Sequence, residues 1–224
     1  MNVTSESRVG EIAARHPLAT RVFARHHIDF CCGGGVALSD ACAKRDLDTA
    51  AVLEEIERVI ASPGTDSGSP HWIEAPVEEL VAHIVSRYHD SLREELPRLE
   101  AMARKVFRVH GDKDPERLGA LLESFLRLQA EVVAHLRQEE ETLFPSLLRS
   151  AMGQPTDLEP FVDDHVRVGQ ELHRIRELTD GFRVPDGACN TWNALWHGLA
   201  ALETDLHEHI HLENNVLFQR IAVA

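Results

Sequence analysis

The chain has 224 residues, of which 43% are hydrophobic, and it carries a formal net charge of −14. This acidic balance excludes a nucleic-acid partner held through its phosphates, because such proteins present a basic stripe. No stretch approaches the ~20 apolar residues that span a membrane, and the N-terminus lacks the basic flank and apolar run of a secretory signal. Four cysteines are too few for a disulfide framework. We therefore expect a cytoplasmic protein with neither a nucleic-acid nor a membrane partner.

The N-terminal part of the chain predicts a small helical domain. Residues 17–28 suit a short helix, and residues 48–60 suit an amphipathic helix that is capped at its start. Three consecutive glycines make residues 31–35 a loop, since each glycine costs a helix ~1 kcal/mol relative to alanine. The Ser-, Gly- and Pro-rich stretch that follows indicates a flexible linker. We assign the small domain to residues 1–61 and the linker to residues 62–75.

Four long segments with helical periodicity follow the linker. We expect helices over residues 76–109, 115–150, 157–180 and 187–221. Their connections are short and carry Gly or Pro, so neighbouring helices should be antiparallel. Pro97 and Pro145 lie inside the first and second segments, where proline kinks a helix. The sequence therefore predicts an all-α fold, in which residues 76–224 form an antiparallel up-down-up-down four-helix bundle behind the small N-terminal domain.

One signature, His-x3-Glu-x3-Leu-Phe, occurs twice in this chain. The first copy begins at His135 and contains Glu139, and the second begins at His209 and contains Glu213. A spacing of four residues puts His and Glu on one face of a helix, about 6 Å apart along its axis. A single pair of this kind is usually solvated and contributes a few tenths of a kcal/mol. The Leu-Phe after each Glu is better explained by core packing.

The connections between the helices predict which residues lie at the same height in the bundle. Two residues of an antiparallel hairpin are level when their midpoint in sequence falls in the turn. The midpoints are position 112 for His89 and His135, position 187 for His165 and His209, and position 152 for Glu139 and His165, and each falls in a connection. The following six side chains should therefore converge in one layer of the core: His89, His135, Glu139, His165, His209 and Glu213.

This set of side chains predicts a pair of metal ions. Burying two carboxylates without cations would cost several kcal/mol, which counts against the alternative of ordinary hydrogen-bonded core histidines. Four imidazoles and two carboxylates suit iron or manganese, with two His for each ion and both Glu bridging. Positions remain for a bridging oxide or hydroxide and for a small exogenous molecule. His110 lies about 31 Å along a continuous helix from His89, and His207 and His211 should point outward, so we exclude all three.

The arrangement resembles the haemerythrin-like di-iron family, in which a helical bundle holds two irons with His and bridging carboxylates. The resemblance implies two non-haem iron ions, bridged by oxide or hydroxide. One position departs from the oxygen-carrying members, which use a second His one turn along the third helix. That position is Gly169 here, which disfavours reversible oxygen carriage and favours a more open, labile centre.

The N-terminal domain resembles that of the repair-of-iron-centres family. The resemblance rests on FCCGGG, which follows RVFARHHIDF and precedes the helix LDTAAVLEEIERVI. With the linker and the bundle, it covers essentially the whole chain. It implies a cytoplasmic stress protein that repairs iron-sulfur clusters and reacts with nitric oxide.

The resemblance makes Cys31 and Cys32 candidate catalytic thiols. The alternative is that they are two small buried apolar side chains, but the adjacent glycines favour an exposed loop. Cys42 and Cys189 have no evident partner, and we expect them to be incidental.

Three functions are open at this point. The favoured one is repair, in which the di-iron centre supplies labile iron to damaged or apo iron-sulfur proteins with the help of Cys31 and Cys32. The alternative is an enzyme that reduces nitric oxide at two adjacent ferrous ions, where proximity couples two bound molecules. A sensor of dioxygen or nitric oxide ranks last, since no segment that would receive its signal is visible. The acidic surface and the linker permit a homodimer.

Overall fold

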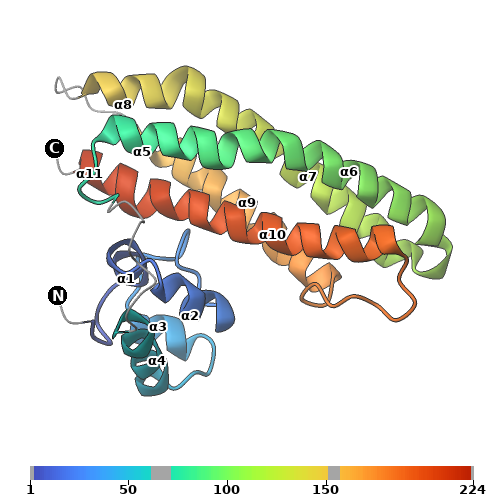
Figure 1. Cartoon of the computed structure of the whole chain (residues 1–224), viewed down its shortest axis with the longest axis horizontal. Helices are drawn as coiled ribbons and strands as arrows, with labels where there is room; N and C mark the ends of the chain where they lie inside the picture. Colours follow the sequence, from blue (N-terminus) through green and yellow to red (C-terminus); the bar gives the residue numbers. More distant parts are fainter. Residues whose placement is uncertain (1–2, 62–71, 151–156, 223–224) are drawn as a thin grey trace. The chain divides into compact units, whose positions relative to one another are not determined.

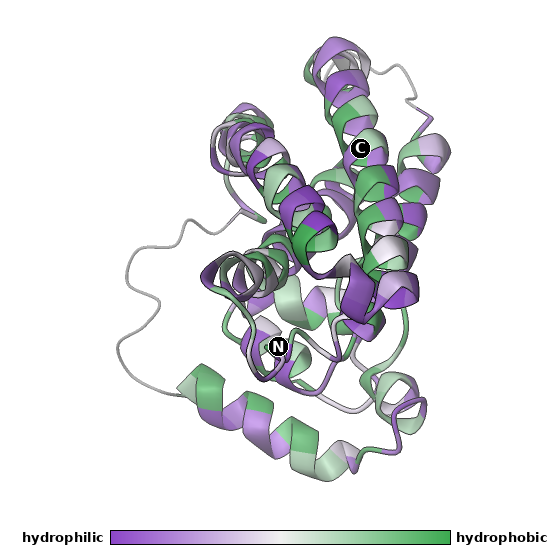
Figure 2. Ribbon diagram, turned by 90° about the vertical axis from the view of Figure 1, so that its right-hand side faces the viewer, coloured by the Kyte–Doolittle hydropathy of each residue, from purple (hydrophilic) through white to green (hydrophobic). Residues whose placement is uncertain are grey.

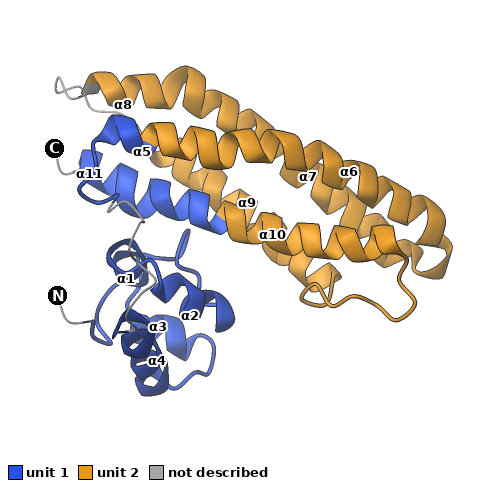
Figure 3. Ribbon diagram, viewed as in Figure 1, with its two compact units in different colours: residues 1–80, 207–224 blue, residues 81–206 orange. Residues whose placement is uncertain are grey.

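The computed structural model describes residues 3–61, 72–150 and 157–222 (Figure 1). Within these ranges every regular element is helical, apart from one isolated bridge between Arg8 and Ala37. The expected all-α class is confirmed. The chain divides into two compact units, Met1–Leu80 with His207–Ala224, and Val81–Leu206 (Figure 3). Most of the expected linker, residues 62–71, lies outside the described residues.

Four short helices form the N-terminal part of the first unit. They are α1 (Val9–Arg15), α2 (Ala19–Arg25), α3 (Leu38–Ala43) and α4 (Thr49–Ala61). The sequence predicted α2 and α4 and missed the other two, because helices of six or seven residues are too short to show a periodic pattern. Asp48 caps α4 as expected, since its Oδ1 accepts a hydrogen bond from the backbone N of Ala50.

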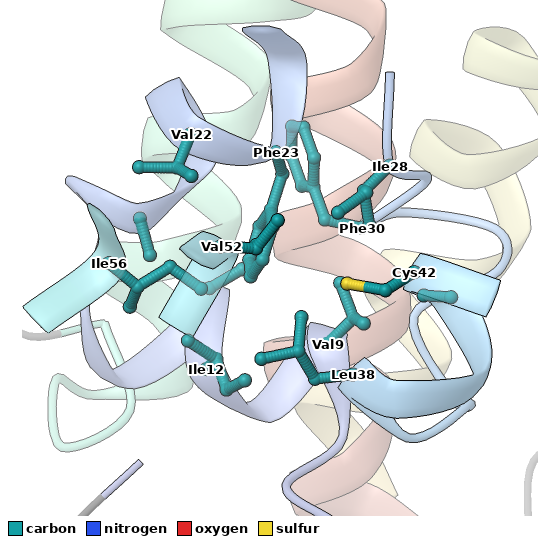
Figure 4. Close-up of a cluster of buried hydrophobic side chains, with 13 residues drawn as sticks. Val9, Ile12, Val22, Phe23, Ile28, Phe30, Leu38, Cys42, Val52 and Ile56 are labelled. Carbon is teal, nitrogen blue, oxygen red and sulfur yellow. The ribbon is translucent and has the colours of Figure 1, made fainter. Parts of the chain in front are cut away.

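An apolar cluster holds these short helices together (Figure 4). Phe23 of α2, Leu38 of α3 and Ile56 of α4 are fully buried within it. Both α2 and α3 pack against α4, and α1 packs against the segment of the chain that begins at Glu213. The first unit therefore joins residues from both ends of the chain.

Four helical rods form the bundle. The first consists of α5 (Val77–Ile84), η1 (Val85–His89) and α6 (Asp90–His110), and the second of α7 (Pro115–Gln138), η3 (Glu139–Leu143) and α8 (Phe144–Ser150). The third is α9 (Glu159–Leu178), and the fourth consists of α10 (Asn190–Leu212), η4 (Glu213–Leu217) and α11 (Phe218–Ala222). These rods coincide with the four expected helices.

Packing between the rods is described here within the second unit. Helix α7 packs against both α6 and α9, and the long helices lie side by side (Figure 1). Arg176 of α9 donates from Nε to Oε1 of Glu203 on α10, at 2.9 Å. Hydrophobic and hydrophilic residues alternate along the helices (Figure 2). Leu96, Phe125 and Leu199 are among the hydrophobic side chains that are buried. None of the described helices is long and apolar enough to cross a membrane.

Three of the rods contain a π-helical turn that the sequence did not predict. These turns are η1, η3 and η4, so the helices expected over residues 76–109, 115–150 and 187–221 are each interrupted. A π turn holds one extra residue, and such turns are frequent at functional sites. Pro97 lies inside α6 and does not end it.

Gly198 of α10 should tolerate no side chain. Its Cβ would collide with Cδ2 of Leu99, which is fully buried, so the helices would have to move apart. We expect Gly198→Ala to lower the free energy of unfolding by about 1–3 kcal/mol.

The matched control is Gly119→Ala in α7. A Cβ there would lie 3.5 Å from the ring of Phe107, an ordinary contact, and alanine should stabilise the helix by about 0.5–1 kcal/mol. Urea unfolding of both variants measures the difference. Equal stability of the two variants would contradict the close approach of α10 to α6.

Candidate metal centre

The six side chains expected to bind metal are all buried, with at most 5% of each exposed. They form two groups that could each hold a metal ion, and the ligand atoms of a group lie within 4.8 Å of one another. The first group is His89, Glu139, His209 and Glu213, and the second is His135, Glu139, His165 and Glu213. The sequence left the pairing of the histidines open. In the structure both glutamates are shared, and each group adds two histidines.

The carboxylate of Glu139 is oriented as a bridge between the two groups. Its Oε1 lies 3.2 Å from Nε2 of His135, whereas its Oε2 lies 3.5 Å from Nε2 of His89. One oxygen of this carboxylate therefore faces each group. On the fourth rod, Nε2 of His209 lies 3.0 Å from Oε1 of Glu213, so the expected His-x3-Glu face is present in both copies of the signature.

The separations between donor atoms fit shared metal ions. Two ligands bound at about 2.1 Å and at right angles on one ion are about 3.0 Å apart. The Nε2 atoms of His135 and His165 are 3.0 Å apart, and the His–Glu separations are similar. The donor set contains nitrogen and oxygen but no thiolate, which suits iron or manganese. Cations would also compensate the two carboxylates, which have no exposed surface.

Two further carboxylates contact two of the candidate ligand histidines. Oε1 of Glu140 lies 2.7 Å from Nδ1 of His89, and Oδ2 of Asp164 lies 3.3 Å from Nδ1 of His135. Such partners fix the tautomer, so that Nε2 is the atom that faces the metal. Burial raises the pKa of Glu140, but hydrogen bonds from His89 and Arg93 outweigh it and hold that pKa below the ordinary value.

Neither of these carboxylates was expected from the sequence. Their only signal is position, because Glu140 follows one expected ligand and Asp164 precedes another. A residue next to a ligand is turned about 100° around the helix, so it faces a neighbouring rod rather than the centre of the bundle.

The π turns coincide with three of the candidate ligands. His89 is the last residue of η1, and Glu139 and Glu213 are the first residues of η3 and η4. In each copy of the repeated signature, Glu begins the π turn and Leu ends it. The Phe that follows begins the next α-helix and is buried, at 3% exposed in both copies. The expected core role of Leu-Phe is confirmed.

The excluded histidines lie outside both groups, but His211 differs from expectation. It was expected to point outward, yet it is 5% exposed, with Nδ1 3.3 Å from the carbonyl oxygen of Phe30. Burial lowers the pKa of His211 to about 4, so it is neutral at pH 7. The Phe30 ring packs edge-on against it, at 5.6 Å between centroids.

The two adjacent cysteines both carry thiols, and one of them is buried. Cys31 is 4% exposed, so the expectation of an exposed loop is wrong for this residue, whereas Cys32 is half-buried. The two Sγ atoms lie 3.8 Å apart, and Sγ of Cys31 lies 3.3 Å from Oδ1 of Asp29. The hydrogen bond with Cys32, burial and the charge of Asp29 raise the pKa of Cys31 well above its usual value. Cys31 is therefore protonated at neutral pH.

Asn215 fastens this cysteine loop to the η4 turn within the first unit. Its Nδ2 donates to the carbonyl oxygens of Phe30, at 3.2 Å, and Cys31, at 3.1 Å. Gly10 and Gly34 allow the approach, because a Cβ at Gly10 would collide with Oδ1 of Asn215 and one at Gly34 would lie 2.7 Å from the oxygen of Phe30. The turn that begins with Glu213 thus also carries the residue that holds the thiol loop.

Comparison with known proteins agrees with this arrangement. Residues 80–221 match the haemerythrin HHE cation-binding domain, and residues 5–60 match ScdA_N, a domain of unknown function (DUF542). The protein is thus a haemerythrin-like cation-binding bundle with a small N-terminal helical region. It is 43% identical over 216 residues, 95% of each chain, to the iron-sulfur cluster repair protein YtfE of Yersinia pseudotuberculosis serotype O:1b, and equally to that of Yersinia pestis strain Pestoides F. The chain belongs to this family of iron-sulfur cluster repair proteins.

Glu140 should strengthen metal binding without being a ligand. We expect Glu140→Gln to weaken iron or manganese binding about 10- to 100-fold, because the orientation of His89 is no longer enforced. Glu141→Gln is the control, since Glu141 is exposed and pairs with Arg137 on its own helix. Competition with a chromogenic chelator measures both affinities. Equal affinities for the two variants would exclude an orienting role for Glu140.

Cys31 should react slowly with an alkylating agent at pH 7, because its raised pKa leaves little thiolate. Asp29→Asn removes a negative charge beside the thiol, which lowers the pKa and should speed alkylation several-fold. Asp40→Asn, an exposed position in α3, should leave the rate unchanged. Peptide mapping by mass spectrometry follows each cysteine separately. Alkylation of wild-type Cys31 as fast as that of exposed Cys189 would contradict the structure.

Proposed function

We propose that this protein repairs iron-sulfur clusters damaged by oxidative or nitrosative stress, and that it does so by supplying iron from a di-iron centre. Two observations support the proposal. The chain is similar over nearly its full length to iron-sulfur cluster repair proteins, and it contains two buried His/Glu groups that share both carboxylates. The second observation carries most of the argument, because it provides places for two ions side by side.

The proposed iron ligands are the six buried side chains: His89, His135, Glu139, His165, His209 and Glu213. Each ion would then have four protein ligands, which leaves about two positions of an octahedral ion without protein ligands. An ion held in this way is more readily released than one that the protein encloses completely. In this proposal iron is both the ion that the six side chains bind and the ion that is transferred to the client.

We propose that Cys31 and Cys32 assist the transfer. Asn215 hydrogen-bonds their loop to the turn that begins with Glu213, so the thiol loop is attached to the element that carries one of the two shared carboxylates. Cys31 must lose its proton to bind a metal ion, since the thiolate is the ligand. Oδ1 of Asp29, 3.3 Å from Sγ, is positioned to accept that proton.

The remaining features follow from this role. The clients would be damaged or apo iron-sulfur proteins, and the protein would work in the cytoplasm beside them. We propose that residues 1–61 and 76–224 act as two domains joined by residues 62–75, and that nitric oxide or dioxygen reaches the uncovered positions of the metal centre. A homodimer is compatible with this organisation.

Transfer of isotopically labelled iron to an apo ferredoxin tests the proposal. Wild-type protein should hold two irons per chain, seen by Mössbauer spectroscopy as a coupled pair, and should restore the client. Glu139→Ala should lose both irons, because this carboxylate belongs to both groups. Cys31→Ser with Cys32→Ser should keep the iron but transfer it at least several-fold more slowly.

Asn215→Ala should resemble the double cysteine variant, because the thiol loop is released. Gln219→Ala, an exposed position one turn further on, is its control. Wild-type protein without iron would overturn the di-iron centre. Transfer at the wild-type rate by the double cysteine variant would overturn the role of the thiols alone.

The sharing of both glutamates also favours a second candidate function, reduction of nitric oxide. Two adjacent ions would hold two molecules in proximity, which lowers the entropic cost of coupling them. Sustained formation of nitrous oxide with a physiological electron donor would support this activity. A single turnover would exclude it while leaving iron transfer unaffected.

A further inference from the structure

A second cluster of reactive side chains lies where α6 ends and α10 begins. Lys105, His110 and Cys189 line a pocket of about 340 Å³. Nε2 of His110 lies 3.3 Å from Sγ of Cys189. His110 is 9% exposed, whereas Cys189 is exposed. The expectation that Cys189 has no partner is therefore wrong.

The side chain of His110 is positioned to act as a base toward the thiol of Cys189. Nε2 of His110 is within hydrogen-bond reach of the thiol, as in other nucleophile–base pairs. The ring of Trp192 lies 4.8 Å from that of His110, within the about 6 Å over which an indole attracts a cation. Cys189 also precedes the first residue of α10, and its carbonyl accepts from the backbone N of Asn193 at 2.9 Å.

We propose that Cys189 is a nucleophilic thiol that forms a mixed disulfide with a small anionic disulfide bound in this pocket. The volume is at the lower end of the range for small-molecule sites, and Lys105 supplies a positive charge for a carboxylate of the reagent. Cys42 provides the contrast, because it is fully buried in the apolar cluster of the first unit and lacks access.

The step balances without any further oxidant. His110 removes the proton from Cys189, and the thiolate attacks one sulfur of the small disulfide. A bond forms between Sγ of Cys189 and that sulfur, while the original S–S bond breaks. The departing thiolate takes the proton from His110. Cys189 is oxidised and the leaving half of the disulfide is reduced. The fraction of Cys189 in the mixed disulfide would therefore follow the ratio of disulfide to thiol around the protein.

The experiment uses the full iron-loaded chain, glutathione disulfide as the anionic reagent and cystamine as the cationic one, at pH 6.5. Peptide mapping by mass spectrometry quantifies the mixed disulfide on each cysteine. We expect native Cys189 to react at least tenfold faster than Cys42, and at least tenfold faster than Cys189 in the urea-unfolded chain. Iron content should not change, because Cys189 lies 20 residues from His209 along one helix, about 30 Å away.

Two variants test which side chains make Cys189 react faster. His110→Gln should slow the reaction of Cys189 about tenfold with both reagents, whereas Lys105→Gln should slow it with glutathione disulfide only. Arg108→Gln, an exposed position on the same helix that does not line the pocket, should match the wild type. If His110→Gln fails to fold, as judged by circular dichroism, the native-versus-unfolded comparison and Lys105→Gln still decide. Equal rates in the native and unfolded chains would overturn the proposal.

Discussion

The burial of two carboxylates is the constraint on which this structure depends. Glu139 and Glu213 have no exposed surface, and two negative charges in a protein core require cations nearby. Metal cations would meet that requirement, and the four imidazoles that could hold them come from one level of four rods. Short connections between the rods bring these histidines to the same height. Glu140 and Asp164 then hold two of the imidazoles by their outer nitrogen atoms. The bundle is therefore organised around charge as much as around apolar packing.

The repeated signature is a structural unit and not only a pair of candidate ligands. In both copies His lies on a regular helix, Glu begins a π turn, Leu ends it, and a buried Phe begins the next helix. The extra residue of the turn is tolerated because buried Leu and Phe side chains anchor its far end. The first rod reaches the same level differently, with His89 as the final residue of η1. The third rod supplies His165 from a helix without such a turn.

The sequence predicted which six side chains come together because spacing and connection lengths are direct geometric information. The spacing of four residues from His135 to Glu139 defines one helix face, and a midpoint in a turn defines a height. The π turns could not be predicted in this way. Each adds one residue to a helical turn, and the amino-acid composition of the segment does not reveal it. Helices α1 and α3 were too short to show a period. The backbone of buried Cys31 is hydrogen-bonded to Asn215, which lies 184 positions away, and the partner of Cys189 lies 79 positions away. Such contacts leave no local signal.

Gly10 and Gly34 illustrate how a missing side chain can determine a distance. Each lies where a single methyl group would strike Asn215 or the backbone of Phe30, so the cysteine loop can approach η4 only while both positions are bare. Mutation elsewhere in the small helices exchanges one apolar group for another and can be absorbed by repacking. Glycine has no side chain to replace, so any substitution at these two positions adds a carbon that would push the loop and η4 apart. The separation between the thiols and the turn that starts at Glu213 is thus protected by two of the smallest residues in the chain.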